Sequence, residues 1–456
     1  MKITNPATEA VIGTVKEFSL NDIRPAYLEL LNGQKVWQDV SVDDRIACIK
    51  KFGDLVKSHI TELAPLLTSE MGKPIKEAHN EILGAHNRID YFSKNVKQWL
   101  QEEQAISKGA TKEKVTYEPL GIVANISAWN YPYNVGYNVF IPALLCGNAV
   151  FYKPSEFTSL TGLKLEKLLH EAGVPENVFK TVTGGKNTGE ALLKLPLNGY
   201  FFTGSYLTGQ KIATEVAPKM VPLQMELGGK DPLYITDDVK DIAQSAAMAV
   251  EGKFYNSGQS CCAVERIYVH EKIYDSFTKA FVKEVEMLRV GDPTREDTDM
   301  GPLARKEQLK FLLFQVNDAL DKGARLLTGD ESLESKGYFF EPTVLTDVNH
   351  DMSLMIDETF GPLVGIQKVE NDEEAIALMN DTSFGLTAAV FSSSQSRAEE
   401  ILSKVNAGTA YWNCSDRVSP TSPWSGRKNS GLGTTLSYQG IRAFLQPKAY
   451  HLRTID

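Results

Sequence analysis

Predicted helices alternate with short β-branched runs along most of this chain, and no other feature of the sequence limits the possible folds as strongly. Between residues 44 and 101, apolar residues recur at three- and four-residue steps, which predicts helices, and Gly72 followed by Pro74 separates them. From about 110 to 230, short apolar runs alternate with helical patterns such as Leu160–Ala172. This alternation is typical of an α/β fold built on parallel sheets.

A second block with the same alternation follows. It runs from the helical pattern Ile242–Tyr255 to the predicted strand Thr409–Asn413. With 456 residues the chain exceeds one ordinary hydrophobic core, since a domain holds about 150 residues. The sequence contains no repeat, low-complexity segment or obvious linker, so we expect its parts to pack extensively. The tail 441–456 is predicted to be an extended strand.

The composition excludes several classes of protein. With 42% hydrophobic and 23% charged residues, the chain is neither disordered nor fibrous. The 48 Lys and Arg against 58 Asp and Glu give a net charge of −10, so no nucleic-acid partner is expected. The most apolar stretch, Val139–Tyr152, is interrupted by Pro142, Gly147 and Asn148, so no membrane association is expected.

The cysteines give no sign of a structural framework. They are Cys48, Cys146, Cys261, Cys262 and Cys414. None stands in a CxxC pair, so we predict neither a disulfide scaffold nor a metal site. The N-terminus lacks the apolar core of a signal peptide. We therefore expect a protein of the reducing cytoplasm.

The adjacent Cys261 and Cys262 follow a loop of small polar residues, Asn256–Ser260. A cysteine thiolate is a strong nucleophile, and such a loop can expose the sulfur. A free cysteine is more often a buried apolar residue, and that interpretation stays open at this point. A cysteine–histidine hydrolase is a further alternative, although none of the seven histidines lies in a hydrolase-like loop.

Three more segments place polar groups at predicted strand ends. In Met225–Lys230 a glutamate precedes a Gly–Gly turn, where a carboxylate can act as a general base. Phe202–Gly209 is a strand–turn–helix pattern whose N–H groups can hold a pyrophosphate, although it is neither GxGxxG nor a P-loop. The lysine and glutamate of Phe151–Glu156 can bind ribose hydroxyls. Each segment is also compatible with an ordinary solvated strand end.

Taken together and in order, these segments resemble the motifs of the NAD(P)-dependent aldehyde dehydrogenase superfamily, in its hydrolytic, non-acylating branch. The similarity runs from about residue 3 to 456, and Glu226 precedes Cys261 by 35 residues, as in the family. The matching segments are Ile126–Pro132 (P-W-N-[FY]-P, with Ala128 for the first proline), Lys153–Glu156 (K-P-[SA]-E), Phe202–Ser205 (F-T-G-S), Glu226–Lys230 (E-L-G-G-K), Phe254–Cys261 (F-x-N-x-G-Q-x-C), Glu358–Pro362 (E-x-F-G-P) and Pro423–Gly433 (P-[FW]-G-G-x-K-x-S-G-x-G, with Ser425 for the first glycine of the pair).

The resemblance implies a catalytic role for three residues. Cys261, which holds the G-Q-x-C position, would attack the aldehyde to give a thiohemiacetal. The Asn130 amide and the Cys261 backbone N–H would hold the oxyanion. After hydride transfer to nicotinamide, Glu226 would activate the water that hydrolyses the thioester.

The same resemblance implies a cofactor site. Lys153 and Glu156 would hold the adenine ribose, Trp129 and Ser205 would contact the pyrophosphate, and Glu358 would hold the nicotinamide ribose. The full expected set is Trp129, Lys153, Ser155, Glu156, Gly204, Ser205, Gly209, Leu227, Glu358 and Phe360. Because a carboxylate at Glu156 repels a 2′-phosphate, we expect NAD rather than NADP, with Lys153 acting in the opposite direction.

Two positions depart from the family pattern. Val139 replaces a lysine that many relatives carry nine residues after the catalytic Asn. Thr435 stands where many relatives carry a glutamate. Since that lysine and glutamate can relay protons near the catalytic glutamate, our hypothesis is that Glu226 acts here with bulk water alone.

The substrate pocket can be interpreted in two ways. Tyr131 and Trp424 resemble aromatic residues that surround cations in aminoaldehyde enzymes. Arg417 can instead anchor the carboxylate of a semialdehyde or pair with Asp416, and Asn138 stands where either class usually has its own marker residue. Tyr255, Ser260 and Cys262 are further expected substrate neighbours. A generic apolar tunnel is the third interpretation.

By resemblance the fold has three parts. We expect a Rossmann-like NAD-binding domain from residues 1–100 and 120–227, a catalytic α/β domain from 228–435, and a small β oligomerisation element from 101–119 and 436–456. The element would join the chain into a homodimer or homotetramer. A CoA-acylating relative and a non-catalytic binding or structural protein of the same fold are the alternatives; Glu226 argues against the first, and the intact catalytic residues argue against the second.

Overall fold

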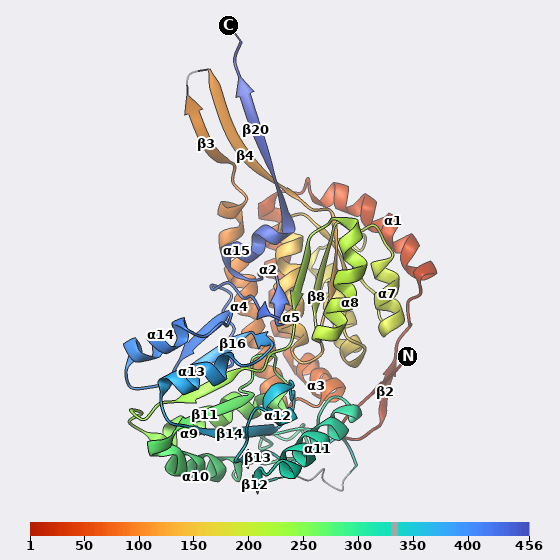
Figure 1. Cartoon of the computed structure of the whole chain (residues 1–456). Coiled ribbons are helices and arrows are strands. Elements are labelled where there is room, and N and C mark those ends of the chain that lie inside the picture. The colour runs from red at the N-terminus through yellow and green to blue at the C-terminus, as the bar shows by residue number, and fades with distance from the viewer. Residues whose placement is uncertain (109, 330–335, 456) are drawn as a thin grey trace.

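The computed structural model describes residues 1–108, 110–329 and 336–455. Two parallel-type sheets with helices on both faces form the body, and a third, antiparallel sheet projects from it (Figure 1). The predicted α/β class is confirmed by this architecture and by similar solved structures. Among the helices of these ranges, none is long and apolar enough to cross a bilayer.

The first sheet has six strands in the order β19-β9-β8-β5-β6-β7, all parallel except the short β19. Its strands are β5 (Ile122–Ile126), β6 (Ala149–Lys153), β7 (Phe179–Thr181), β8 (Gly199–Thr203), β9 (Leu223–Glu226) and β19 (Gly431–Leu432). Because the strands are parallel, the segments that follow them meet at one edge of the sheet. That edge carries the ends of β5, β6, β8 and β9 and the segments after them, in which the sequence predicts Asn130, Glu226 and most of the cofactor residues.

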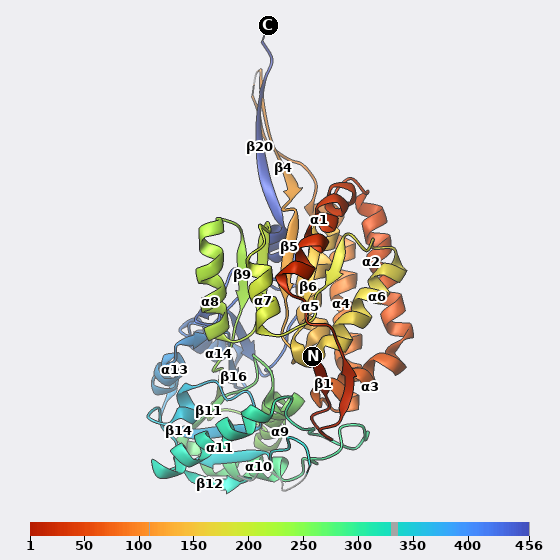
Figure 2. The same ribbon diagram turned by 90° about the vertical axis from the view of Figure 1, so that its right-hand side faces the viewer.

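Helices cover both faces of this sheet (Figure 2). On one face lie α5 (Pro132–Leu145) and α6 (Ser159–Ala172), with α2 (Val42–Ser58), α3 (Ile60–Met71) and α4 (Ile75–Trp99) packed outside them; on the other lie α1 (Leu20–Trp37), α7 (Lys186–Leu193) and α8 (Tyr206–Val216). The N-terminal strands β1 (Lys2–Thr4) and β2 (Val11–Thr14) form a separate antiparallel pair. The helical periodicity between 44 and 101 corresponds to α2, α3 and α4, and Gly72 ends α3 in the left-handed conformation.

The helix α5 was not predicted from the sequence. Eleven of its fourteen residues are buried, because α4 covers the side that faces away from the sheet. A helix buried on all sides lacks the polar stripe that gives helical periodicity, so its residues resemble a buried strand.

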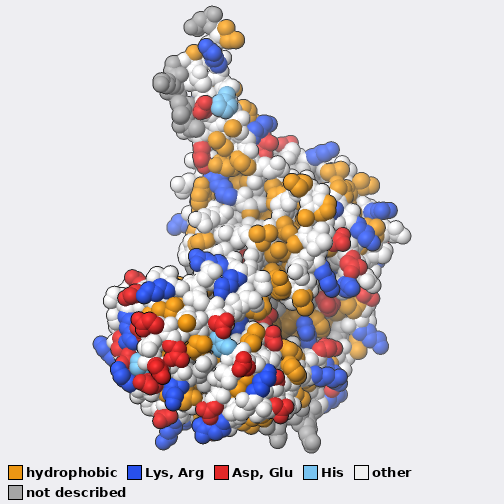
Figure 3. Space-filling model, in the orientation of Figure 1, with side chains coloured by type: hydrophobic (Ala, Val, Ile, Leu, Met, Phe, Trp, Pro, Cys, Tyr) orange, Lys and Arg blue, Asp and Glu red, His pale blue; other side chains and the backbone are white. Residues whose placement is uncertain are grey.

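The second sheet has seven strands in the order β12-β13-β14-β11-β10-β16-β17, parallel except for β12. Its strands are β10 (Pro232–Ile235), β11 (Arg266–His270), β12 (Arg325–Thr328), β13 (Thr343–Thr346), β14 (Leu363–Val369), β16 (Thr387–Phe391) and β17 (Thr409–Trp412). The helices α9 (Ile242–Phe254) and α10 (Tyr274–Val285) enclose one core on this sheet, and α11 (Lys306–Asp321), α12 (Ser353–Ile356), α13 (Asp372–Asn380) and α14 (Gln395–Ser403) enclose another. Side chains of both charges intermingle over this part of the surface (Figure 3).

The projecting sheet pairs segments from distant parts of the chain. It consists of β3 (Glu103–Lys108), β4 (Thr111–Pro119) and β20 (Leu445–Arg453), in the order β20-β4-β3 (Figures 1 and 2). The short helix α15 (Ser437–Ile441) leads into β20. The predicted strand at 441–456 is therefore present, although it begins later than expected. A small pair of β15 (Phe384–Gly385) and β18 (Arg427–Lys428) completes the strands.

Candidate active site

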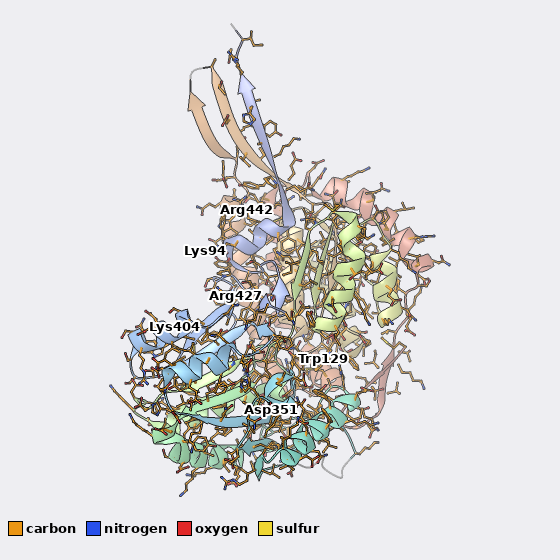
Figure 4. The ribbon with its side chains drawn as sticks, in the orientation of Figure 1. Lys94, Trp129, Asp351, Lys404, Arg427 and Arg442 are labelled. Atoms are coloured by element: carbon orange, nitrogen blue, oxygen red, sulfur yellow. The ribbon has the colours of Figure 1, made fainter. Side chains whose placement is uncertain are left out.

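A cavity of about 990 Å³ lies between the two parallel-type sheets. Its wall is formed by the loops at the edge of the first sheet, by α4 and α5, and by the segment before β11. Trp129, labelled in Figure 4, marks this region. The predicted residues that line the cavity are Trp129, Asn130, Tyr131, Gly204, Ser205, Glu226, Leu227, Tyr255, Ser260, Cys261, Cys262, Glu358, Phe360, Arg417 and Trp424.

The loop that carries Cys261 has a constrained backbone. Asn256 and Ser257 both have positive φ angles, and a Cβ on Gly258 would lie 2.4 Å from the carbonyl oxygen of Gly361, so glycine is needed there. The Asn256 N–H donates to Glu77 Oε2 over 2.9 Å. The strained loop is thus held in place by its surroundings, and it presents the half-buried Cys261 to the cavity.

The neighbouring thiol has a different environment. Cys262 is buried, and its Sγ donates to Asp416 Oδ1 over 2.9 Å. The hydrogen bond with Cys261, together with burial, raises the pKa of the Cys262 thiol well above its usual value. Cys262 therefore stays protonated, and Cys261 is the better placed nucleophile of the pair.

Asn130 lies beside this loop, at the start of α5. Its Nδ2 donates to the carbonyl of Gln259 over 3.1 Å, two residues before Cys261. Its own carbonyl accepts from Lys73 Nζ over 2.8 Å, and Lys73 forms a buried ion pair with Glu81 of α4. The helix α4 thereby fixes the Asn130 amide next to the cysteine loop.

Glu226 is the last residue of β9 and faces the cavity. Burial raises the pKa of Glu226 to about 8, while hydrogen bonds from Thr435 and Trp424 act in the opposite direction. Thr435 Oγ1 donates to Oε1 over 2.8 Å, whereas Oε2 has no protein partner among the described residues. The carboxyl group is thus oriented by Thr435 and has one oxygen free for a water molecule.

The two sequence departures have different structural settings. Thr435 contacts the catalytic glutamate directly. Val139 is buried in the core that α5 shares with α4 and is not part of the cavity wall. Position 139 therefore provides no polar relay, and the sequence did not predict that Thr435 would donate a hydrogen bond to Glu226.

Glu358 and Phe360 are positioned by a buried charge cluster. Glu265 accepts from Lys230 Nζ over 2.8 Å, and its oxygens also accept the N–H groups of Thr359 and Phe360. Against the effect of burial, the charges of Lys230 and Lys253 lower the pKa of Glu265 to about 2. The motif lysine is thus a structural anchor for the Glu358–Pro362 segment, and sequence reasoning missed its partner Glu265.

Glu358 itself faces the cavity. Burial raises its pKa to about 7, and its Oε1 accepts from the Gly229 N–H over 3.0 Å. The rings of Trp129 and Phe360 meet edge to face, with centroids 5.5 Å apart. Gly204 and Ser205 precede the N-terminus of α8, where N–H groups favour an anion. These groups suit the ribose, the ring and the pyrophosphate of a nicotinamide dinucleotide.

Four predicted cofactor residues lie outside the cavity wall. Lys153 is buried and donates to the Pro154 carbonyl, Ser155 donates to Glu156 Oε2 over 3.2 Å, and Gly209 lies in the first turn of α8 with the Leu227 side chain against it. They stand at or just after the end of β6 and at the start of α8, at the same edge of the sheet as the cavity.

Several predicted substrate residues already have partners within the chain. The ring of Tyr131 already has Lys73 Nζ 3.7 Å from its centroid, and Ser260 donates to Asp416. Arg417 is exposed and pairs with Glu251 at 3.5 Å. The alternative pairing of Arg417 with Asp416 was wrong, because Asp416 is directed at Ser260 and Cys262.

Known proteins resemble this chain in sequence over nearly its whole length. The model of the aldehyde dehydrogenase family matches residues 1–450. A betaine aldehyde dehydrogenase of Vibrio vulnificus is 35% identical over 453 residues, which is 98% of this chain and 92% of that protein. A peroxisomal aminoaldehyde dehydrogenase of Pisum sativum is 34% identical over 465 residues, 99% of this chain and 92% of that protein.

Solved structures have the same fold as this chain over nearly its whole length. An NADP-dependent enzyme of E. coli has a TM-score of 0.97 at 30% identity and covers 99% of this chain and 94% of its own. A Staphylococcus aureus betaine aldehyde dehydrogenase in complex with NAD⁺ has a TM-score of 0.95 at 31% identity, with 99% and 91% covered. The chain described here belongs to the aldehyde dehydrogenase family and is an oxidoreductase that oxidises an aldehyde with NAD(P)⁺.

Proposed function

We propose that the chain converts an aldehyde to the carboxylic acid through a covalent intermediate on Cys261, which is released by hydrolysis. The observation that supports this most directly is that Cys261, Asn130 and Glu226 line one cavity together with Glu358 and Phe360. Nucleophile, oxyanion donor, base and cofactor contacts are thus within reach of one bound aldehyde.

In the first half of the reaction the Cys261 thiolate attacks the aldehyde carbon. The Asn130 Nδ2–H and the Cys261 backbone N–H stabilise the oxyanion of the resulting thiohemiacetal. A bound nicotinamide dinucleotide supplies the hydride acceptor. Loss of hydride from the thiohemiacetal carbon, with return of the oxygen lone pair to the carbonyl, leaves a thioester on Cys261.

In the second half Glu226 accepts a proton from water, and the hydroxide adds to the thioester carbon. Collapse of this adduct breaks the C–S bond, releases the acid and returns the electron pair to the Cys261 sulfur. Glu226 must be ionised for this step, and the hydrogen bond from Thr435 favours that form. No lysine or glutamate relay takes part in this scheme, so the proton passes to solvent.

The test is NADH or NADPH formation across a panel of aldehydes, with and without CoA. Turnover without CoA that is lost in C261A but retained in C48A, a half-buried cysteine outside the cavity, would support the hydrolytic reaction. Strict dependence on CoA would instead identify the acylating alternative. Tight NAD binding without turnover of any aldehyde would favour the non-catalytic one.

NAD is the cofactor that we propose the chain prefers. Glu156 is half-buried at the end of β6, with Ser155 donating to it, and a carboxylate there repels a 2′-phosphate. This is tested by measuring kcat/KM with NAD and with NADP in wild type and E156Q. The ratio of kcat/KM for NAD to kcat/KM for NADP should be lower in the variant.

The division into a cofactor domain (1–100 and 120–227), a catalytic domain (228–435) and an oligomerisation element (101–119 and 436–456) is part of this proposal. The pairing of β20 with β4 supports the last of these, although β19 reaches back from 228–435 to pair with β9. We propose that the projecting sheet joins copies of the chain into a homodimer or homotetramer.

The free cysteines are consistent with a reducing cytoplasm.

A further inference from the structure

The charged residues of the cavity wall are almost all paired or already assigned. Glu81 binds Lys73 and the Tyr133 N–H, Arg417 pairs with Glu251 at the exposed rim, and Asp416 accepts from Ser260 and Cys262. Glu226 and Glu358 belong to the proposed catalytic and cofactor groups. Three charged residues of the wall have no ion pair in the part of the chain that the structure describes: Arg305 and Glu307, which are half-buried and exposed, and Arg88 on the α4 side, which is buried. No role assigned so far uses Arg88.

Arg88 is a buried cation that forms no direct ion pair among the described residues. Its side chain is 4% exposed and forms part of the cavity wall. Its Nε donates to Asn138 Oδ1 over 2.6 Å, and in the described ranges no carboxylate oxygen lies within 4.0 Å of its guanidinium. Burial lowers the pKa of Arg88 to about 10, against the opposing effect of the Glu81 charge, so the group is still charged at neutral pH. A charged guanidinium that is buried and unpaired is unfavourable unless a ligand supplies the anion.

The surroundings of Arg88 leave its two Nη groups available. The hydrogen bond to Asn138 engages only Nε, which fixes the plane of the guanidinium and leaves its terminal fork without a partner among the described residues. Such a fork matches the two oxygens of a carboxylate. Lys73, a buried cation behind this wall, is neutralised by Glu81.

The helix α4 also provides space beside this group. Gly84 lies one turn before Arg88 and lines the cavity, and a Cβ built there meets no atom within 4 Å. The remaining polar neighbours on this wall are the neutral amides Asn80, Asn87 and Asn134. The wall therefore offers one positive charge, neutral hydrogen-bonding groups and open volume.

We propose that Arg88, oriented by Asn138, binds an anionic group at the end of the substrate distant from the aldehyde, and that the preferred substrates are oxo acids with a distal carboxylate. This rests on the proposed function of the same cavity. One guanidinium among neutral amides matches the single charge of a carboxylate better than the higher charge of a phosphate. A cationic aminoaldehyde meets Arg88 as a like charge, and the Tyr131 ring that would receive it is occupied by Lys73.

The experiment compares kcat/KM for succinic semialdehyde, its neutral analogue butanal, the cation 3-aminopropanal and glyceraldehyde 3-phosphate. In wild type we expect the oxo acid to exceed butanal by about 100-fold, since a charge-assisted bidentate contact in a buried site contributes about that factor. R88M should remove most of this ratio, chiefly through KM for the oxo acid, and R88K should restore part of it. R24M removes the same charge from an exposed position on α1, outside the cavity, and should leave the ratio unchanged.

A measurement on the wild-type protein alone covers the case in which R88M does not fold. Succinate, which carries a second carboxylate, should inhibit at least about ten times more strongly than butanoate, because only succinate can bind Arg88 with one carboxylate and place the other at the aldehyde end of the cavity.

Several outcomes would overturn the proposal. Equal or better use of 3-aminopropanal or butanal by wild type would do so while leaving the aldehyde dehydrogenase reaction intact, and preference for glyceraldehyde 3-phosphate would replace carboxylate by phosphate. Loss of the ratio in R417M but not in R88M would move the anchor to the rim. Absence of turnover with every aldehyde would instead contradict the proposed function itself.

Discussion

At the scale of single residues, the chemistry of the site depends on a few hydrogen bonds made by neighbours of the catalytic groups. Cys262 donates a hydrogen bond to Asp416, which keeps its thiol protonated, whereas Cys261 faces the cavity. Thr435 donates to Glu226 and occupies a position where relatives carry an acid. An alcohol at that position stabilises the ionised base directly, whereas a second carboxylate would oppose its ionisation.

The Thr435 contact predicts a change in pH dependence. Since the hydrogen bond favours the carboxylate form of Glu226, T435V should raise the pKa of Glu226 further above its value of about 8. The pH at which thioester hydrolysis reaches half its maximum should rise by about one pH unit, with T435S close to wild type. Single-turnover rates of acid release across pH measure this.

The adjacent threonine provides the control. The Thr434 carbonyl accepts from Gln224, but none of the hydrogen bonds of the described residues involves its hydroxyl, so T434V should keep the wild-type profile. An identical pH profile in T435V and wild type would show that Thr435 does not tune the base.

At the scale of elements, α4 connects the catalytic loop to the substrate wall. Lys73, just before α4, donates to the Asn130 carbonyl ahead of α5, and Glu81 of α4 accepts the Tyr133 N–H in the first turn of α5. Arg88, further along α4, donates to Asn138 of α5. A glycine in the middle of a helix is destabilising unless space is needed. A Cβ at Gly84 would displace no packed neighbour, so close packing does not require glycine there. The open volume that Gly84 leaves in the cavity best explains why the helix has this destabilising residue.

Two helical glycines give opposite predictions for stability. G84A should stabilise the protein by about 0.5–1 kcal/mol, because the added methyl meets open space and alanine favours the helix. G53A in α2 should destabilise it by about 1–3 kcal/mol, because a Cβ there lies 2.7 Å from the His86 ring. Denaturant midpoints of the two variants measure this; destabilisation by G84A would mean that the helix requires glycine for another reason.

At the scale of the whole molecule, most of the projecting sheet lies outside the hydrophobic cores of the two parallel-type sheets. β4 and β20 pair along nine residues, and β20 is an edge strand with exposed apolar residues at its end. A long unpaired edge is normally covered, and a second copy of the chain is the simplest cover.

Removal of residues 447–456 should therefore change the assembly rather than the fold. Residues 447–455 are exposed or half-buried, and their loss leaves the two parallel-type sheets intact. We expect the full chain to have the mass of a dimer or tetramer and the truncated chain that of a monomer, by size exclusion with light scattering. Equal masses for both chains, or a monomeric full chain, would contradict the proposed interface.

The sequence by itself determined the fold class and the family. Periodicity is local, so strands such as Arg266–His270 and the helices on both sides could be recognised without knowledge of their neighbours. The ordered motifs likewise predicted Cys261 and Glu226 as nucleophile and base, and both line the same cavity. Only the tertiary structure decided what depends on distant contacts: the burial of α5 by α4, the Glu265 anchor, the orientation of Glu226 by Thr435 and the isolation of Arg88. The partners in these contacts are separated by up to about two hundred residues, and their spacing follows from packing, which no local pattern encodes.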